Sequence, residues 1–211
     1  MRYPRFLLLL FCFSLLAACQ KAEAPQRLIT DDLSVAVAPF TQPRQTAELL
    51  SGFIPEDQVK ADADTLAALD EAFRQKLAAS KRPYIFLSHA DVDGEPALDA
   101  RGRRSALATW AARARTAGAD IIVVPQLIDL RERVGSGAGA LSPASVNEDF
   151  YLIDAREPVT LLQRCHFAAE QKALANDVTR ILSFFKRKGK WLTAQELAAE
   201  GMAKAVEELG L

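Results

Sequence analysis

The strongest hydrophobic pattern in the chain lies at residues 121–130. The run from Ile121 to Val124 is apolar and β-branched throughout, and alternation of polar and apolar residues follows it. This change of period predicts a strand that is buried on both faces at its start and on one face at its end. Apolar runs at residues 34–40 and 150–153 predict two further strands that pair around it.

Helical periodicity separates the predicted strands in the first half of the chain. From residue 62, apolar residues recur at spacings of three, four and four, which makes one helix face: Leu66, Leu69, Phe73 and Leu77. Residues 84–87 predict the next strand, residues 88–101 a polar loop, and residues 102–117 a second helix that Gly118 closes. The order strand, helix, strand, helix, strand favours parallel pairing through right-handed crossovers.

The second half of the chain has a different pattern. Residues 145–154 and 159–167 predict two strands joined by a short link around Pro158, which indicates an antiparallel hairpin. Helices are predicted over residues 176–185 and after Thr193, where Thr193 and Glu196 have the spacing of a capping box. We therefore expect one three-layered α/β domain whose mixed five-stranded sheet is parallel first and antiparallel later, flanked by about four helices.

The amino terminus has the pattern of a secretory leader. Arg2 and Arg5 precede an apolar run at residues 6–16, which is too short to span a bilayer as a stable helix. The run ends in a segment that resembles a bacterial lipobox, formed by Leu16, Ala17, Ala18 and Cys19.

The lipobox resemblance implies a signal peptide at residues 1–18 and acylation of Cys19 by diacylglycerol and palmitate. Gln20 is not the Asp that retains lipoproteins at the inner membrane, so the resemblance implies anchoring at the periplasmic face of the outer membrane. Residues 19–33 are polar and predict a flexible tether. Residues 34–211 are then the folded domain.

Charge and cysteine content narrow the class of protein. Removal of Arg2 and Arg5 from 26 basic residues leaves 24 against 27 acidic ones, a balance that gives no indication of nucleic-acid binding. Cys12 leaves with the leader and Cys19 carries lipid, so Cys165 is the thiol that remains. An internal disulfide is excluded, and stability must come from the core.

Candidate catalytic and metal-binding residues are few. Residues 88–91 hold Ser88, His89 and Asp91, but neighbours in sequence rarely converge on one nucleophile. Aligning Gly94 with the glycine of a calcium loop puts Ala100 where a Glu is required. The glycine-rich residues 135–139 are not followed by the Lys and Ser/Thr that end a Walker phosphate loop, and His166 beside Cys165 is too small a set for zinc. We expect no catalytic site, no metal and no cofactor.

Two surfaces are candidates for contact with other molecules. The first is apolar and lies in the loop at residues 41–55: Leu49, Leu50, Phe53 and Ile54. The alternative for this loop is packing onto its own domain. The second is basic and could meet anionic lipid or an acidic partner: Lys186, Arg187, Lys188 and Lys190. The alternative for this run is a solvated helix end.

The lipobox, the strand at residues 35–40 and the passage from helix to strand at residues 117–125 together resemble the TolB amino-terminal-like α/β domains. The predicted hairpin at residues 150–167 is also similar to theirs. Such domains occur in envelope lipoproteins of the curli-secretion, penicillin-binding-protein-activator and transport-auxiliary types. The resemblance implies a non-enzymatic accessory role. A pore is not expected, because residues 132–143 are too few and too rich in glycine for membrane strands.

The expected function is therefore that of a lipid-anchored periplasmic adaptor that binds an envelope protein. Two alternatives remain. One is an envelope hydrolase that works through residues 88–95, and the other is a module that binds a small molecule or glycan in a pocket beside the carboxyl ends of the strands.

Overall fold

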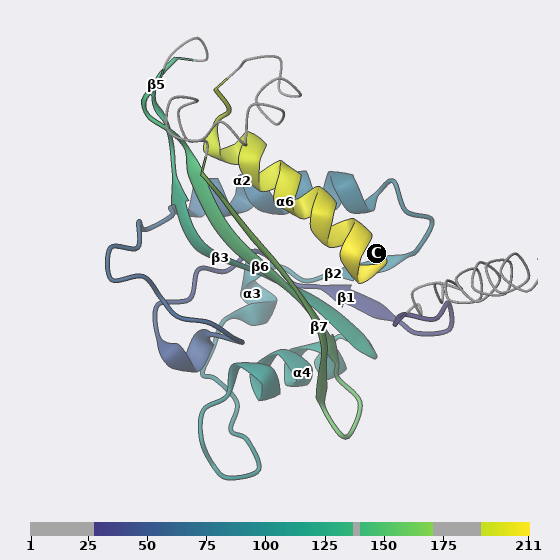
Figure 1. Cartoon of the computed structure of the whole chain (residues 1–211). Coiled ribbons are helices and arrows are strands. Elements are labelled where there is room, and N and C mark those ends of the chain that lie inside the picture. The colour runs from purple at the N-terminus through teal and green to yellow at the C-terminus, as the bar shows by residue number, and fades with distance from the viewer. Residues whose placement is uncertain (1–27, 137–139, 171–190) are drawn as a thin grey trace, which may run out of the picture.

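The fold is organised around a five-stranded sheet with the order β2-β1-β3-β6-β7. The computed structural model describes residues 28–136, 140–170 and 191–211 (Figure 1). Strands β1 (Val35–Val37), β2 (Tyr84–Phe86) and β3 (Ile121–Arg131) are parallel to one another, with β1 between the other two. The predicted parallel half of the sheet is confirmed.

The second half of the sheet is antiparallel, as predicted. Strand β6 (Ser145–Asp154) pairs with β3 over its whole length, and β7 (Thr160–Glu170) pairs with β6. Strand β3 is buried from Ile121 to Ile128 and only half-buried from Asp129 onward, which is the change that its sequence pattern predicts. Two short strands, β4 (Val134–Gly135) and β5 (Ala140–Ser142), pair with each other in the connection between β3 and β6.

Helices cover both faces of the sheet. Figure 1 shows α2 (Ala63–Leu77) and α6 (Ala194–Leu209) on one face and α4 (Ala106–Thr116) on the other. Each helix begins at a side chain that accepts a backbone N–H bond: Asp62, Thr193 and Ser105. The capping box predicted at Thr193 is confirmed. None of the helices in the described ranges is long and apolar enough to cross a membrane.

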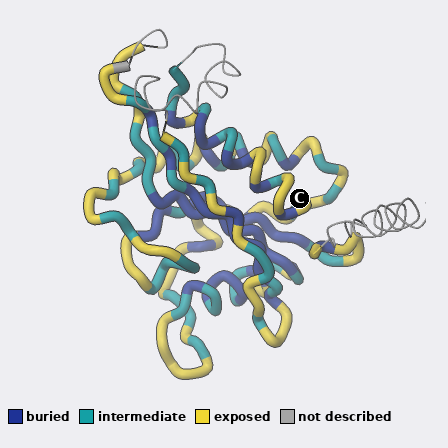
Figure 2. The backbone as a smooth tube through the Cα atoms, viewed as in Figure 1, coloured by how far each residue is buried: buried dark blue, intermediate teal, exposed yellow. Residues whose placement is uncertain are grey.

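The two faces of the sheet enclose separate apolar clusters. The cluster under α2 and α6 contains Phe40, Phe73 and Phe150, whose rings pack with centroids 5.3–6.1 Å apart. The cluster under α4 contains Trp110 and Tyr151. Figure 2 shows the buried strands between these layers, with exposed residues concentrated in the connecting loops.

Helix α6 lies very close to β6 and β7, because Gly201 has no side chain at the crossing. A Cβ atom at Gly201 would lie 2.5 Å from Phe167 Cδ1 and would overlap Glu148 Oε1. Glu148 is 0% exposed, and within the described ranges its carboxylate has no hydrogen-bond partner. Burial, reinforced by the negative charge of Asp149, raises the pKa of Glu148 well above its usual value of 4.5. The carboxyl group is therefore held in its protonated form.

The sequence predictions differ from the structure at three places. Residues 88–101 were expected to form only a loop, but a short helix, α3 (His89–Val92), begins there because Ser88 caps it. The helix expected over residues 102–117 begins only after Ser105. The first strand ends at Val37; beyond it, the Ala38 N–H donates to the Val123 carbonyl of β3 and Thr41 forms an isolated bridge with β3. The helix expected at residues 176–185 lies outside the described residues.

Candidate partner-contact surface

The loop at residues 42–60, called here the glutamine-pinned loop, lies on the same face of the sheet as α4. It contains a short 3₁₀ helix, η1 (Thr46–Glu48), and little other regular structure. Leu50 from this loop packs against the apolar cluster under α4. A loop of this length without regular structure needs side-chain partners for its backbone groups.

Three glutamines supply those partners. Gln126 of β3 is 1% exposed; its Nε2 donates to the carbonyl of Glu48 at 2.8 Å, and its Oε1 accepts from the backbone N–H of Leu50 at 3.3 Å. Gln42 bonds in the same two-sided way to Val59 and Ala61, both across the base of the loop.

Gln58 makes the third link, since its Nε2 donates to the carbonyl of Ile128 at 2.6 Å. Arg131 of β3 also donates to Asp57, at 2.7 Å to the carboxylate. The loop is therefore held to the sheet at several points along its length.

An ion pair between a buried aspartate and an exposed arginine holds residue 51 of the loop. Asp149 of β6 is 1% exposed and accepts two bonds from Arg164 of β7, at 2.8 and 2.9 Å. The hydrogen bonds that Arg164 donates to Asp149 raise the pKa of Arg164, so its guanidinium stays charged. Arg164 then donates to Ser51 Oγ at 3.3 Å, and the Tyr151 hydroxyl donates to the Ser51 carbonyl at 3.3 Å.

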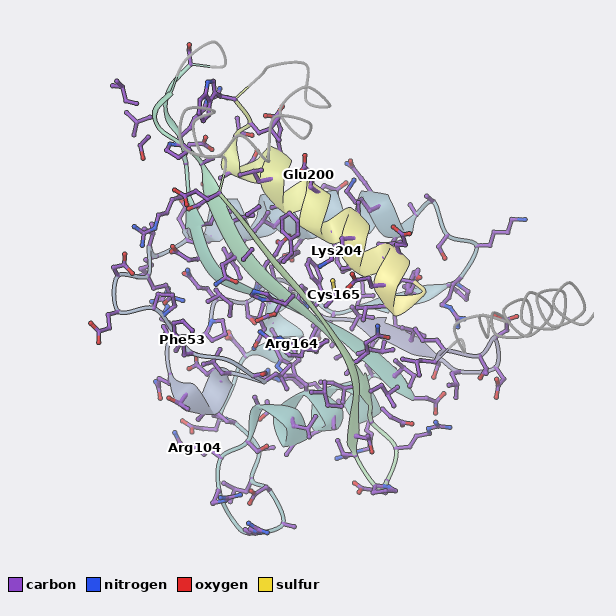
Figure 3. All side chains as sticks on the ribbon, in the orientation of Figure 1. Phe53, Arg104, Arg164, Cys165, Glu200 and Lys204 are labelled. Carbon is purple, nitrogen blue, oxygen red and sulfur yellow. The ribbon has the colours of Figure 1, made fainter. Side chains whose placement is uncertain are left out.

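Burial and the neighbouring Asp149 raise the pKa of Tyr151, which keeps its hydroxyl group a hydrogen-bond donor. His166 also contacts Asp149, with Nδ1 2.9 Å from Oδ1. This contact gives His166 a structural role in place of a metal-binding one. Figure 3 shows Arg164 on β7 near the centre of the sheet and Phe53 at the outer end of the loop.

The four apolar residues predicted for partner contact have different environments. Phe53 is 75% exposed and follows Gly52, whose φ of 88° turns the chain at the tip. Leu49, Leu50 and Ile54 are half-buried. The loop therefore packs on its own domain, as the alternative reading held, and it still presents one large aromatic side chain to solvent.

The residues of the hydrolase alternative do not form a triad. Ser88 and Asp91 bond to each other in the capping box of α3, with Ser88 Oγ 2.6 Å from Asp91 Oδ2. His89 instead contacts Asp70 of α2, with Nε2 2.9 Å from Oδ2. Burial raises the pKa of Asp70, which also accepts a bond from the backbone N–H of Phe40. The histidine that a triad requires as the base for Ser88 is therefore engaged with Asp70.

The part of the chain that the structure describes holds few residues that could bind a metal ion or act as a reactive thiol. No group of three or more His, Cys, Asp or Glu residues is placed to hold a metal ion there. Cys165 is a free, buried thiol, and burial raises its pKa to about 12. A thiol with so little thiolate is a poor nucleophile at neutral pH.

The pairing of Asp149 with Arg164 was not predicted from the sequence. The signal was the run Asn147, Glu148 and Asp149 inside a strand otherwise rich in large apolar residues. Successive side chains of a strand point to opposite faces, so at least one of two adjacent acids had to be buried. The predicted lipidation segment (Leu16, Ala17, Ala18 and Cys19) and the basic run (Lys186, Arg187, Lys188 and Lys190) lie outside the described residues.

Comparisons with known proteins do not place the chain in a family. No family model matches it, and no curated protein does. Among solved structures, it is similar to the PelC dodecamer from Paraburkholderia phytofirmans, with 13% identity over 86% of this chain and 89% of that one and a TM-score of 0.48.

Two further neighbours are more distant. The hypothetical protein CT253 from Chlamydia trachomatis has 17% identity over 82% of this chain and 95% of that one, with a TM-score of 0.40. Lipoprotein GNA1162 from Neisseria meningitidis has 12% identity over 74% of this chain and 98% of that one, with a TM-score of 0.35. At such low TM-scores these likenesses carry no conclusion about function, and the TolB-like resemblance stays a prediction.

Proposed function

We propose that this chain is a lipid-anchored accessory protein of the bacterial envelope that binds a protein partner through the glutamine-pinned loop. One observation carries the proposal: hydrogen bonds from side chains of the sheet fix the loop, yet Phe53 of this loop is 75% exposed. A phenylalanine that a fixed loop presents to solvent offers a partner a large, rigid apolar contact area.

Fixing the loop in advance favours binding. Association loses free energy when a mobile loop and its side chains become ordered, and a loop already held by hydrogen bonds avoids most of that loss. Aromatic anchors that fill a pocket on the partner contribute disproportionately to interface energy. Phe53 is placed to act as such an anchor.

The anchor at Cys19 would confine this contact to the membrane surface. A purified outer-membrane fraction is expected to contain the wild-type chain and to lack the Cys19→Ala variant. Recovery of both forms in the same soluble fraction would contradict lipid anchoring. The partner proposal would then have to be tested for a free periplasmic protein.

Photocrosslinking tests the partner contact. A benzophenone amino acid at position 53 of the full-length chain is expected to give one discrete protein adduct in living cells. The matched control is position 98, because Leu98 is also a large exposed apolar residue, at 60%, and lies in a different loop. Equal adducts at both positions, or none at position 53, would contradict the assignment of the loop as the contact surface.

A further inference from the structure

A cavity of 180 Å³ lies between the glutamine-pinned loop and α4. It opens where Thr41 and Gln42 follow the carboxyl end of β1. The sheet order β2-β1-β3 makes this a topological switch point, because the chain passes from β1 to β2 on one side and then from β2 to β3 on the other side of β1. Open α/β sheets bind their ligands in the crevice at such a point.

One face of α4 forms a rigid wall of the cavity. Thr109, Trp110 and Arg113 all line it, and spacings of three and four residues put Thr109 and Trp110 beside Arg113 on the helix surface. Trp110 is only 4% exposed. The Thr109 hydroxyl donates to the Ser105 carbonyl and accepts from the backbone N–H of Ala97, which fixes the wall in place.

Arg113 is a half-buried cation without an anionic contact. Its guanidinium carbon lies 4.9 Å from the centre of the Trp110 ring. Burial lowers the pKa of Arg113, and the charge of Asp93 only partly opposes this effect. Within the described ranges, the Arg113 guanidinium makes no ion pair or hydrogen bond. None of its nitrogen atoms is fully buried without a hydrogen-bond partner. Its N–H groups are therefore open to the cavity and to solvent.

Among the other polar groups that line the cavity, the two glutamines and Glu48 have hydrogen-bond partners, and Asp93 is an acid whose negative charge acts on Arg113. The amide groups of Gln126 and Gln42 bond to the backbone of the loop, and Glu48 accepts from the N–H of Arg44. Five N–H donors in a planar fork, held against an aromatic ring, match the two oxygens of a carboxylate. Ligand pockets for larger organic molecules measure about 300–1,000 Å³, so this cavity suits a smaller molecule.

We propose that the cavity binds a small organic acid, with its carboxylate paired to Arg113. The size suits an acid of about the size of an amino acid. Residues 42–43 and 47–48 of the glutamine-pinned loop line the cavity, but Phe53, the proposed anchor for the protein partner, does not. Either assignment can fail while the other holds.

Tryptophan fluorescence tests the proposal on the full-length chain in detergent micelles. The chain has two tryptophans, so a Trp191→Phe background leaves Trp110 as the reporter. Titration with N-acetylglycine is expected to give a saturable change in emission, whereas the neutral N-acetylglycinamide is expected to give none. Arg113→Gln should weaken binding by about tenfold or more, because a charge-assisted pair is lost.

The matched control is Arg104→Gln. Arg104 is exposed, pairs with Glu95 and does not line the cavity (Figure 3). It should leave N-acetylglycine binding unchanged. Equal weakening by both variants, or tighter binding of inorganic phosphate than of N-acetylglycine, would overturn the assignment. If Arg113→Gln fails to fold, the test is the comparison of N-acetylglycine with N-acetylglycinamide on the chain that retains Arg113. Equal binding of the two ligands would overturn the proposal.

Discussion

The hydrogen bonds of Gln126 give the sharpest test of how the glutamine-pinned loop is held. Gln126→Ala removes the donor to the Glu48 carbonyl at 2.8 Å and the acceptor for the Leu50 N–H at 3.3 Å. Each such bond contributes about 0.5–1.5 kcal/mol net. The two together should therefore stabilise the closed loop by about 1–3 kcal/mol.

The loss is expected to be mainly local. If the loop can lift while the sheet stays folded, the freed backbone groups of residues 48 and 50 will regain water and the global free energy of unfolding will fall by less than the full amount. Hydrogen exchange then reports the difference. The Leu50 amide should exchange about tenfold faster or more, since about 1.4 kcal/mol corresponds to a factor of ten in the opening equilibrium.

The matched control is Gln75→Ala on the exposed surface of α2. Gln75 bonds only to the Glu71 carboxylate, at 2.9 Å, and surface substitutions of this kind change stability by about 0.5 kcal/mol or less. Urea unfolding and amide-resolved exchange should be measured on both variants. Unchanged exchange at Leu50 in Gln126→Ala, or equal changes in both variants, would refute the idea that this side chain holds the loop.

Three further substitutions test the packing of α6 and β6. Gly201→Ala should lower the free energy of unfolding by about 2 kcal/mol, because overpacking against Phe167 and Glu148 costs about 3 kcal/mol and the better helix propensity returns about 1; a more stable variant in urea would contradict the close crossing. Glu148 has a raised pKa when folded, so stability should fall as pH rises above about 4.5, at up to about 1.4 kcal/mol per pH unit. Glu148→Gln should flatten that slope in a series of urea titrations, and an unchanged slope would be the contrary result. Thr193→Ala should cost about 1 kcal/mol through loss of the α6 cap, and no change in the urea midpoint would speak against the cap.

The sequence was sufficient for most of the fold because its strands differ in pattern. The β-branched run at Ile121 predicted a strand buried on both faces, and the short link at Pro158 predicted the hairpin of β6 and β7. These signals are local, since they depend on period and on the length of a connection. Helix α3 was not predicted, and α4 begins later than predicted, because Ser88 and Ser105 act as caps only once the preceding chain is extended.

The site could be predicted only in part, because its contacts join residues far apart in the chain. Phe53 was one of four apolar residues of the loop that the sequence predicted for partner contact. The loop that carries Phe53 is held by hydrogen bonds of Ser51 with Arg164, 113 residues later, and of Leu50 with Gln126, 76 residues later. No local pattern contains such pairs. A polar residue inside a buried strand, as at Gln126 and Asp149, is the signal that marks a position where a distant partner is required.

The most direct test of the account is the affinity of the full-length chain for the partner captured at position 53. Phe53→Ser should weaken binding by about tenfold or more, as expected for loss of an aromatic anchor, whereas Leu98→Ser should leave it unchanged. Both residues are exposed, so neither change should affect folding. Equal affinities of the wild-type chain and the Phe53→Ser variant would contradict contact through the glutamine-pinned loop.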